Sequence, residues 1–127
     1  MVSKTRLYDA FGELIYAVAL ADSMIQEAEI SVLEKVLAGH PWSKEIRWSF
    51  DYELKRENQL MDTYHKALET LKENGPHADY AYLVEVLEAV AEASDGFHKK
   101  EGQIISNLQK SLKSHFIQYL DDNALLS

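Results

Sequence analysis

Two pairs of acidic residues occupy equivalent places in two similar stretches of the chain. The first pair is Asp22 and Glu29, and the second is Asp95 and Glu101. In each stretch the aspartate ends an apolar helical stripe, a short turn follows, and the glutamate opens a second stripe. Carboxylate oxygens beside backbone carbonyls are the ligands that Ca²⁺ and Mg²⁺ prefer. The pattern therefore predicts that these four residues bind a divalent cation, with Glu27 as a further oxygen donor.

Helix capping explains the same residues without a ligand. An aspartate at a helix junction commonly accepts hydrogen bonds from exposed backbone N–H groups, and a glutamate in a first turn meets the positive end of the helix dipole. Neither turn has the alternating oxygen-bearing residues that precede the glycine of an EF-hand. The residues alone therefore leave three roles open for the acidic pairs, which are helix capping, cation binding and contact with a protein partner.

The elements that carry the two pairs repeat one another. A segment from about residue 7 to 38 aligns with one from about residue 80 to 112, at a shift of 73 before the turn and of 72 after it, because the second turn is one residue shorter. The aligned apolar pairs are Leu7/Tyr80, Ala10/Leu83, Phe11/Val84, Leu14/Leu87, Val18/Ala91, Val32/Ile104, Leu33/Ile105 and Val36/Leu108. The acidic pairs coincide in the same alignment. We therefore predict an internal helix-loop-helix duplication with an acidic pair kept at each turn.

The middle of the chain also has helical spacing. Apolar residues between about 42 and 73 recur at steps of three and four, which predicts two helices with a boundary near residues 56–58. The residues assigned to this stripe are Trp42, Ile46, Phe50, Leu54, Leu60, Met61, Tyr64, Leu68 and Leu71. Trp48 falls beside the stripe, so we expect it to be exposed while most other aromatic residues pack in the core. A groove lined by Trp48 and Tyr82 is a further hypothesis.

Two stop signals divide the helices. Gly39 followed by Pro41 ends one helix and Asn-Gly-Pro at residues 74–76 ends another, because glycine tolerates left-handed backbone and proline lacks the N–H that a helix interior needs. No alternating strand pattern of useful length competes with this reading. The fold class predicted is all-α, a single domain over residues 1–127 built as a bundle of about six or seven helices.

Composition excludes several classes of partner. Thirteen basic residues against 21 acidic ones give a net charge of −8, which repels nucleic acid and anionic lipid surfaces. No apolar run approaches the roughly 20 residues of a membrane-spanning helix, so direct membrane insertion is not expected. The absence of cysteine removes disulfides, thiolate metal sites and cysteine nucleophiles, and it favours a cytoplasmic location.

Catalytic motifs are missing from the sequence. It has no phosphate-binding glycine loop, no Gly-x-Ser-x-Gly elbow and no His-Glu-x-x-His zinc helix. No Glu-x-x-His pair of the di-iron bundles occurs either. The five histidines are expected at the surface or partly packed, and they are His40, His65, His77, His98 and His115. We expect a protein that is not an enzyme, with an unrecognised hydrolase as the weakest alternative.

The two turn segments, residues 21–29 and 94–101, resemble the tellurite-resistance TerB-like family, which also forms the amino-terminal module of certain membrane-anchored J-domain co-chaperones. The resemblance extends from about Leu7 to Leu112. It implies an α-helical, mostly cytoplasmic bacterial protein associated with tellurite and stress resistance. It also implies cation-dependent association with membrane-linked protein partners and no established catalytic reaction.

Matched residue by residue, the family motif nominates Asp22 and Glu29 in the first half and Asp95 with Glu101 in the second, together with Gly96. The sequence departs from the pattern where serine replaces the usual glycine after Asp22, and where the second turn is one residue shorter. The expected function is a noncatalytic interaction module that binds a divalent cation at its acidic turns. The alternative is a metal-dependent sensor or ion-binding resistance factor in which cation binding changes helix packing.

Overall fold

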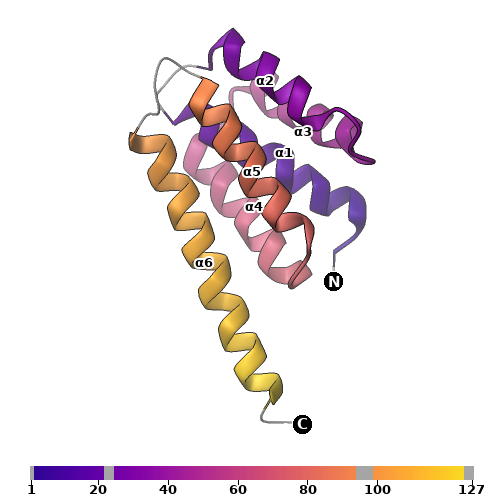
Figure 1. The fold of residues 1–127 in the computed structure, drawn as a ribbon, viewed down its shortest axis with the longest axis vertical. Coiled ribbons are helices and arrows are strands. Elements are labelled where there is room, and N and C mark those ends of the chain that lie inside the picture. The colour runs from indigo at the N-terminus through magenta and orange to yellow at the C-terminus, as the bar shows by residue number, and fades with distance from the viewer. Residues whose placement is uncertain (1, 22–24, 94–98, 125–127) are drawn as a thin grey trace.

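The computed structural model describes residues 2–21, 25–93 and 99–124, and this part of the chain is organised as six helices without a strand (Figure 1). In chain order they are α1 (Lys4–Leu20), α2 (Glu27–Leu37), α3 (Ser43–Arg56), α4 (Leu60–Asn74), α5 (Asp79–Ala93) and α6 (Lys99–Ala124). The predicted all-α fold class is confirmed, at the lower of the two helix numbers. The apolar residues near 116–120 continue α6 and do not start another helix.

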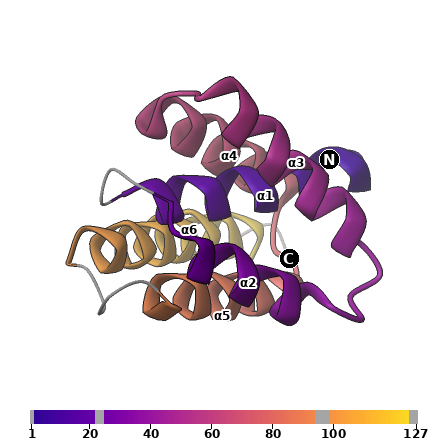
Figure 2. The ribbon, with the colours of Figure 1, turned by 90° about the horizontal axis from the view of Figure 1, so that it is seen from above.

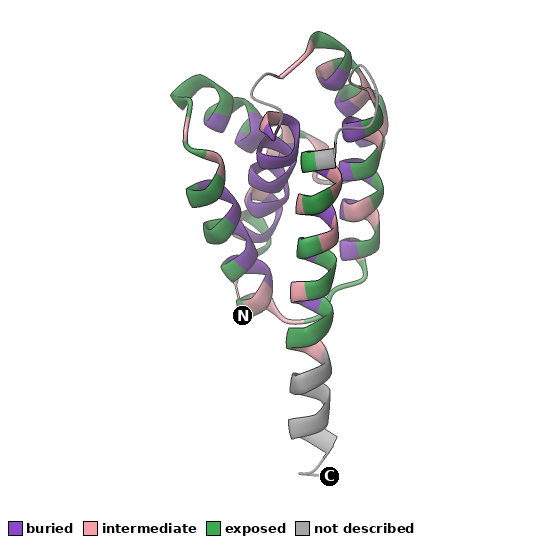
Figure 3. Cartoon of the chain, turned by 90° about the vertical axis from the view of Figure 1, so that its left-hand side faces the viewer, coloured by how far each residue is buried: buried purple, intermediate pink, exposed green. Residues whose placement is uncertain are grey.

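Helix α1 lies in the middle of the bundle. Figure 2 shows it running between α3 and α4 on one side and α2, α5 and α6 on the other. Every residue from Ala10 to Ala19 is buried, which leaves α1 without a solvent face along that length (Figure 3). A helix with apolar residues nearly all round its circumference is the kind that a bundle places inside.

The helix ends follow the local signals in the sequence. Ser3 caps α1, because its hydroxyl accepts a hydrogen bond of 3.1 Å from the backbone N–H of Arg6. Gly39 and Gly75 adopt φ angles of 86° and 87° just beyond α2 and α4, in the region that favours glycine. Glu57 ends α3 in a left-handed conformation with φ of 52°, so the predicted boundary near residues 56–58 is confirmed.

The predicted stripe was wrong at two residues. Leu54 is 36% exposed and Met61 is 53% exposed, whereas Glu53 is only 1% exposed. The buried face of α3 runs through Ile46 and Phe50, and the next helical step from Phe50 reaches Glu53 before Leu54. The face of the helix therefore determines burial here, although the residue on that face is charged.

Several of the positions aligned in the two predicted repeats have similar burial. Leu14 and Leu87 are both fully buried in α1 and α5, and Leu33 and Ile105 are both buried in α2 and α6. One hydrophobic cluster contains residues from all six helices. Along α6 it reaches Leu112, beyond which the ring of Phe116 stacks on Tyr80 with centroids 5.8 Å apart. None of the described helices combines the length and apolarity needed to cross a membrane.

A close crossing of α1 and α3 occurs at Gly12. A methyl group on this glycine would lie 2.4 Å from the carbonyl oxygen of Ile46 and 2.8 Å from the backbone nitrogen of Phe50. Both contacts are with backbone, which cannot turn away as a side chain does. The absence of a side chain at Gly12 therefore sets how closely α3 can approach the central helix.

We expect Gly12→Ala to destabilise the protein by about 1–3 kcal/mol, because the added methyl must push α3 away from α1. In a helix without this contact the same change stabilises by about 0.5–1 kcal/mol. Urea unfolding measures the difference in free energy. A stabilising effect would contradict the close crossing.

Leu87→Ala should lower the free energy of unfolding by about 2–5 kcal/mol, because the leucine is fully buried in the core of α5. The neighbouring exposed residue supplies the control, since Glu88→Ala should stay within about 0.5 kcal/mol. Thermal and urea unfolding of the two variants test the helical phase of α5, and equal stabilities would show it to be wrong.

Candidate functional site

The helix ends that flank the two predicted acidic turns lie at the same end of the bundle. The end of α1, the start of α2, the end of α5 and the start of α6 gather there in both Figure 1 and Figure 2. We call this the junction end. It follows from the antiparallel course of the two hairpins, because α2 packs on α5 while α5 also contacts α1 and α6.

Two buried glutamates lie at the junction end. Glu29 is 1% exposed in the first turn of α2, and Glu101 is 0% exposed in the first turn of α6. The Oε1 atom of Glu29 accepts a hydrogen bond of 3.0 Å from the backbone N–H of Gln26, which completes a capping box. Capping is therefore part of what Glu29 does, as the first-turn position predicted. Glu27, the further donor suggested by the sequence, is exposed.

The other nominated residues, Asp22, Asp95 and Gly96, lie outside the described residues. In the part of the chain that is described, no three residues of the types that bind metals form a cluster. The donor chemistry of Glu29 and Glu101 still suits Ca²⁺ or Mg²⁺, since both cations take carboxylate oxygens and are held more firmly away from bulk water.

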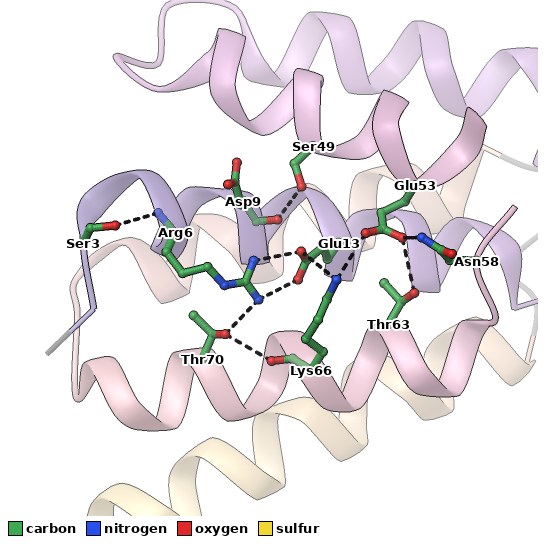
Figure 4. A network of polar contacts seen from close by, with 10 residues as sticks. All are labelled: Ser3, Arg6, Asp9, Glu13, Ser49, Glu53, Asn58, Thr63, Lys66 and Thr70. Carbon is green, nitrogen blue, oxygen red and sulfur yellow. Dashed lines mark hydrogen bonds and ion pairs between the residues drawn. The ribbon is translucent and has the colours of Figure 1, made fainter. Parts of the chain in front are cut away.

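A second group of buried charges joins α1 to α4 (Figure 4). The guanidinium of Arg6 donates two hydrogen bonds to Glu13, of 2.8 and 3.0 Å, in the bidentate geometry typical of strong arginine–carboxylate pairs. The same guanidinium donates to the hydroxyl of Thr70 at 2.9 Å. Lys66 on α4 places its ammonium 3.4 Å from Glu13. Glu13 is thereby compensated from two helices.

The same lysine compensates the buried glutamate of α3. The Nζ atom of Lys66 lies 3.4 Å from the Oε1 atom of Glu53. The Oε2 atom of Glu53 accepts hydrogen bonds from the side-chain amide of Asn58 and the hydroxyl of Thr63. Asn58 in turn accepts a 2.8 Å hydrogen bond from Tyr16 at its backbone carbonyl. Lys66 therefore connects the carboxylates of α1 and α3 while its own side chain stays half exposed.

The geometry of this network indicates a structural role and not a binding site. Each carboxylate is satisfied by cations and hydroxyl or amide donors of the chain, which is the arrangement that makes buried charge tolerable. Sequence reasoning did not single out Glu13 or Glu53. The available signal was phase, because Glu13 shares the face of Arg6 two turns earlier, and Glu53 lies in step with Ile46 and Phe50.

A third polar group lies at the opposite end of the bundle from the junction end. Asp79, the first residue of α5, accepts a 2.6 Å hydrogen bond from Tyr8, and its Oδ2 atom lies 3.3 Å from Nε2 of His40. The Nδ1 atom of His40 accepts from the backbone N–H of Trp42 at 3.0 Å, so Nε2 carries the proton directed at Asp79. The Tyr8 hydrogen bond, aided by His40, holds the pKa of Asp79 below its ordinary value.

The histidines are placed largely as expected. His40 is half-buried, while His65, His77 and His115 are exposed, and His98 lies outside the described residues. Trp48 is 57% exposed on α3, as predicted. Tyr82 packs its ring on His40 with centroids 4.6 Å apart and donates to the carbonyl of Val36. The hypothesis of a groove shared by Trp48 and Tyr82 stays untested.

Comparison of the chain with protein-family models, with curated proteins and with solved structures finds no match. The TerB-like resemblance therefore stays a prediction from the sequence, based on the duplication and on the spacing of its acidic turns.

Removal of the shared cation tests the buried network. Lys66→Met should destabilise the protein by about 1–3 kcal/mol, because two buried carboxylates lose a compensating charge. Lys72→Met is the matched control on the same helix, since its partner Glu69 is exposed and lies 3.8 Å away. That variant should stay within about 0.5 kcal/mol. Equal losses in urea unfolding would show that Lys66 is an ordinary surface lysine.

Proposed function

We propose that this protein is a noncatalytic, TerB-like interaction module that docks on a partner protein through its junction end. There its acidic turns would bind a divalent cation, through Asp22 and Glu29 in the first turn or Asp95 and Glu101 in the second. The observation that carries the proposal is the burial of two first-turn glutamates at one end of the bundle. Together with the family resemblance, this favours a cytoplasmic role in tellurite or stress resistance alongside membrane-linked protein partners.

The energetics of burial support a cation at this end. Moving a carboxylate out of water costs several kcal/mol in a real protein. A helix dipole returns about 0.3–1 kcal/mol, and about 2 kcal/mol in favourable buried geometries. Both glutamates lie in first turns, where backbone N–H groups and the helix dipole favour negative charge. A divalent cation takes carboxylate oxygens as ligands and would add positive charge beside such groups.

The sequence itself argues against direct chemistry on tellurite. The chain has no cysteine to reduce or bind the oxyanion, and its net charge of −8 repels anions. A role through protein association agrees with both facts.

Calorimetric titration with Ca²⁺, Mg²⁺, Mn²⁺ and Zn²⁺ tests the cation site. We expect saturable binding of at least one of them with a dissociation constant below about 1 mM, the range in which weak calcium modules operate. Asp22→Ala, Asp95→Ala and Glu101→Gln should each weaken it at least about tenfold. Glu88→Gln on the exposed face of α5 removes the same charge as Glu101→Gln and should leave binding unchanged.

Two results would contradict the proposal. Absence of saturable binding by the wild type would remove the cation, and equal weakening by Glu88→Gln and Glu101→Gln would reduce the effect to net charge. Partner capture from native extract, with and without chelator, then tests docking. Capture that is lost with chelator and with Asp95→Ala alike is the expected result.

The sensor function is the second candidate, and the position of Glu101 favours it. This residue opens α6, which contacts α1, α4 and α5, so a cation there can shift the whole helix. NMR separates the two functions. A docking module should show cation-induced shifts confined to the junction end, whereas a sensor should show them along α6 as far as Leu108 and Leu112.

A further inference from the structure

An exposed row of side chains runs along the outer face of α3. Trp48 and Tyr52 are both exposed, and their rings stack with centroids 5.4 Å apart. The guanidinium of Arg56 lies 5.3 Å from the centre of the Tyr52 ring. The three residues follow one another at steps of four, which places them on one line of the helix. Large exposed aromatic residues in such a row are typical of recognition surfaces.

Trp48 stands between two hollows. The first, of about 430 Å³, lies between α2 and α3 and has an apolar floor that includes Leu37 and Ala38. The second, of about 490 Å³, lies between α1 and α3 and includes Asp9 and Glu45. Trp48 lines both. Trp48 thus separates an apolar hollow, over Leu37 and Ala38, from an acidic hollow that includes Asp9 and Glu45.

The acidic hollow contains two neighbouring carboxyl groups, those of Asp9 and Glu45. Burial, followed by the neighbouring carboxyl of Glu45, raises the pKa of Asp9 to about 7. The Oδ1 atom of Asp9 is enclosed and receives no hydrogen bond from an N–H or O–H donor in the described part of the chain. The further charges that act on Asp9 come from Arg6 and Glu13 of α1, the first lowering its pKa and the second raising it.

We propose that the Trp48 face of α3 is a docking surface for an extended segment of a partner protein that carries one basic and one apolar side chain. The basic side chain enters the hollow of Asp9 and Glu45 with its stem along the indole. The apolar side chain enters the hollow over Leu37 and Ala38. This surface is separate from the junction end.

Charge complementarity selects this occupant. A guanidinium or ammonium between the two carboxyls relieves their mutual repulsion and gains a cation–π contact with Trp48. Lys44 also lines both hollows, and its exposed chain can swing into solvent when the partner's cation enters. In the apolar hollow, Arg47 is already paired with Glu34 at 2.8 Å and with Asp51 at 3.0 Å. That hollow therefore presents mainly its apolar floor.

The probes are short capped peptides in which a leucine and an arginine are separated by one, two or three glycines. Binding is followed by NMR through the indole N–H of Trp48, and the indole of Trp42, which stacks on Tyr8, is the internal reference. We expect saturable shifts at Trp48 for at least one spacing. Replacement of the peptide arginine by glutamate, or of its leucine by serine, should abolish or strongly weaken them.

Variants of the chain locate the contact. Glu45→Gln should weaken peptide binding about tenfold, and Trp48→Ala should weaken it about three- to tenfold. Glu88→Gln has the same charge change on a distant face and should have no effect. Asp95→Ala, which removes one of the carboxylates proposed to bind the cation, should also leave peptide binding intact. Failure of this proposal is thus distinguishable from failure of the proposed cation site.

The pH dependence gives a second readout. With a pKa of about 7, the Asp9 carboxyl loses its proton between about pH 6 and pH 8, so peptide binding should strengthen as pH rises, and Glu45→Gln should flatten that rise. The native state binds the Asp9 proton more tightly than the unfolded chain does, so this carboxyl lowers stability as pH rises toward 7. Asp9→Asn should therefore raise the melting temperature more at pH 8 than at pH 5, which also shows that the variant folds.

Three outcomes would overturn the proposal. One is equal binding of the arginine and glutamate peptides, and another is equal weakening by Glu45→Gln and Glu88→Gln. The third is a homodimer in sedimentation equilibrium that Trp48→Ala dissociates while no peptide binds, which would identify the occupant as a second copy of the chain.

Discussion

The enclosure of α1 on all sides is the constraint on which the rest of the structure depends. A helix without a solvent face has to present a suitable surface to every neighbour. Its small residue at position 12 allows α3 to approach closely. Its one fully buried charge, Glu13, requires a cation from its own helix and another from α4. The close contact at Gly12 therefore sets the position of α3, and the ion pair between Glu13 and Lys66 helps to set the position of α4.

The fold contains buried carboxylates of two kinds, and the difference bears on function. Glu13 lies in the middle of α1 and Glu53 in the last turn of α3, and both are met by lysine, arginine or neutral donors of the chain. Glu29 and Glu101 lie in first turns, where backbone N–H groups and helix dipoles already favour negative charge. The first kind holds helices together. The second kind lies at the junction end, where we propose that a divalent cation binds.

Helical periodicity and glycine positions were sufficient to predict most of the architecture. Stripes at three- and four-residue steps, together with Gly39 and Gly75, gave the helices and their ends because these are local properties of the chain. Trp48 was predicted to be exposed for the same reason, since it lies out of phase. The periodicity failed at Glu53, because choosing apolar residues moved the stripe to Leu54, away from the face that packs on α1. Charge compensation by Lys66 is a tertiary property, and no local pattern contains it.

The polar contacts around Asp79 restrict how this bundle can move. They join the start of α1, the turn after α2 and the start of α5 by hydrogen bonds and stacked rings. Helices fastened to each other at one end can diverge only at the other, so any hinge between the two hairpins must pivot near Tyr8 and His40. The amplitude of such a motion is then greatest at the end of α1, the start of α2 and the end of α5. These are helix ends that adjoin the acidic turns.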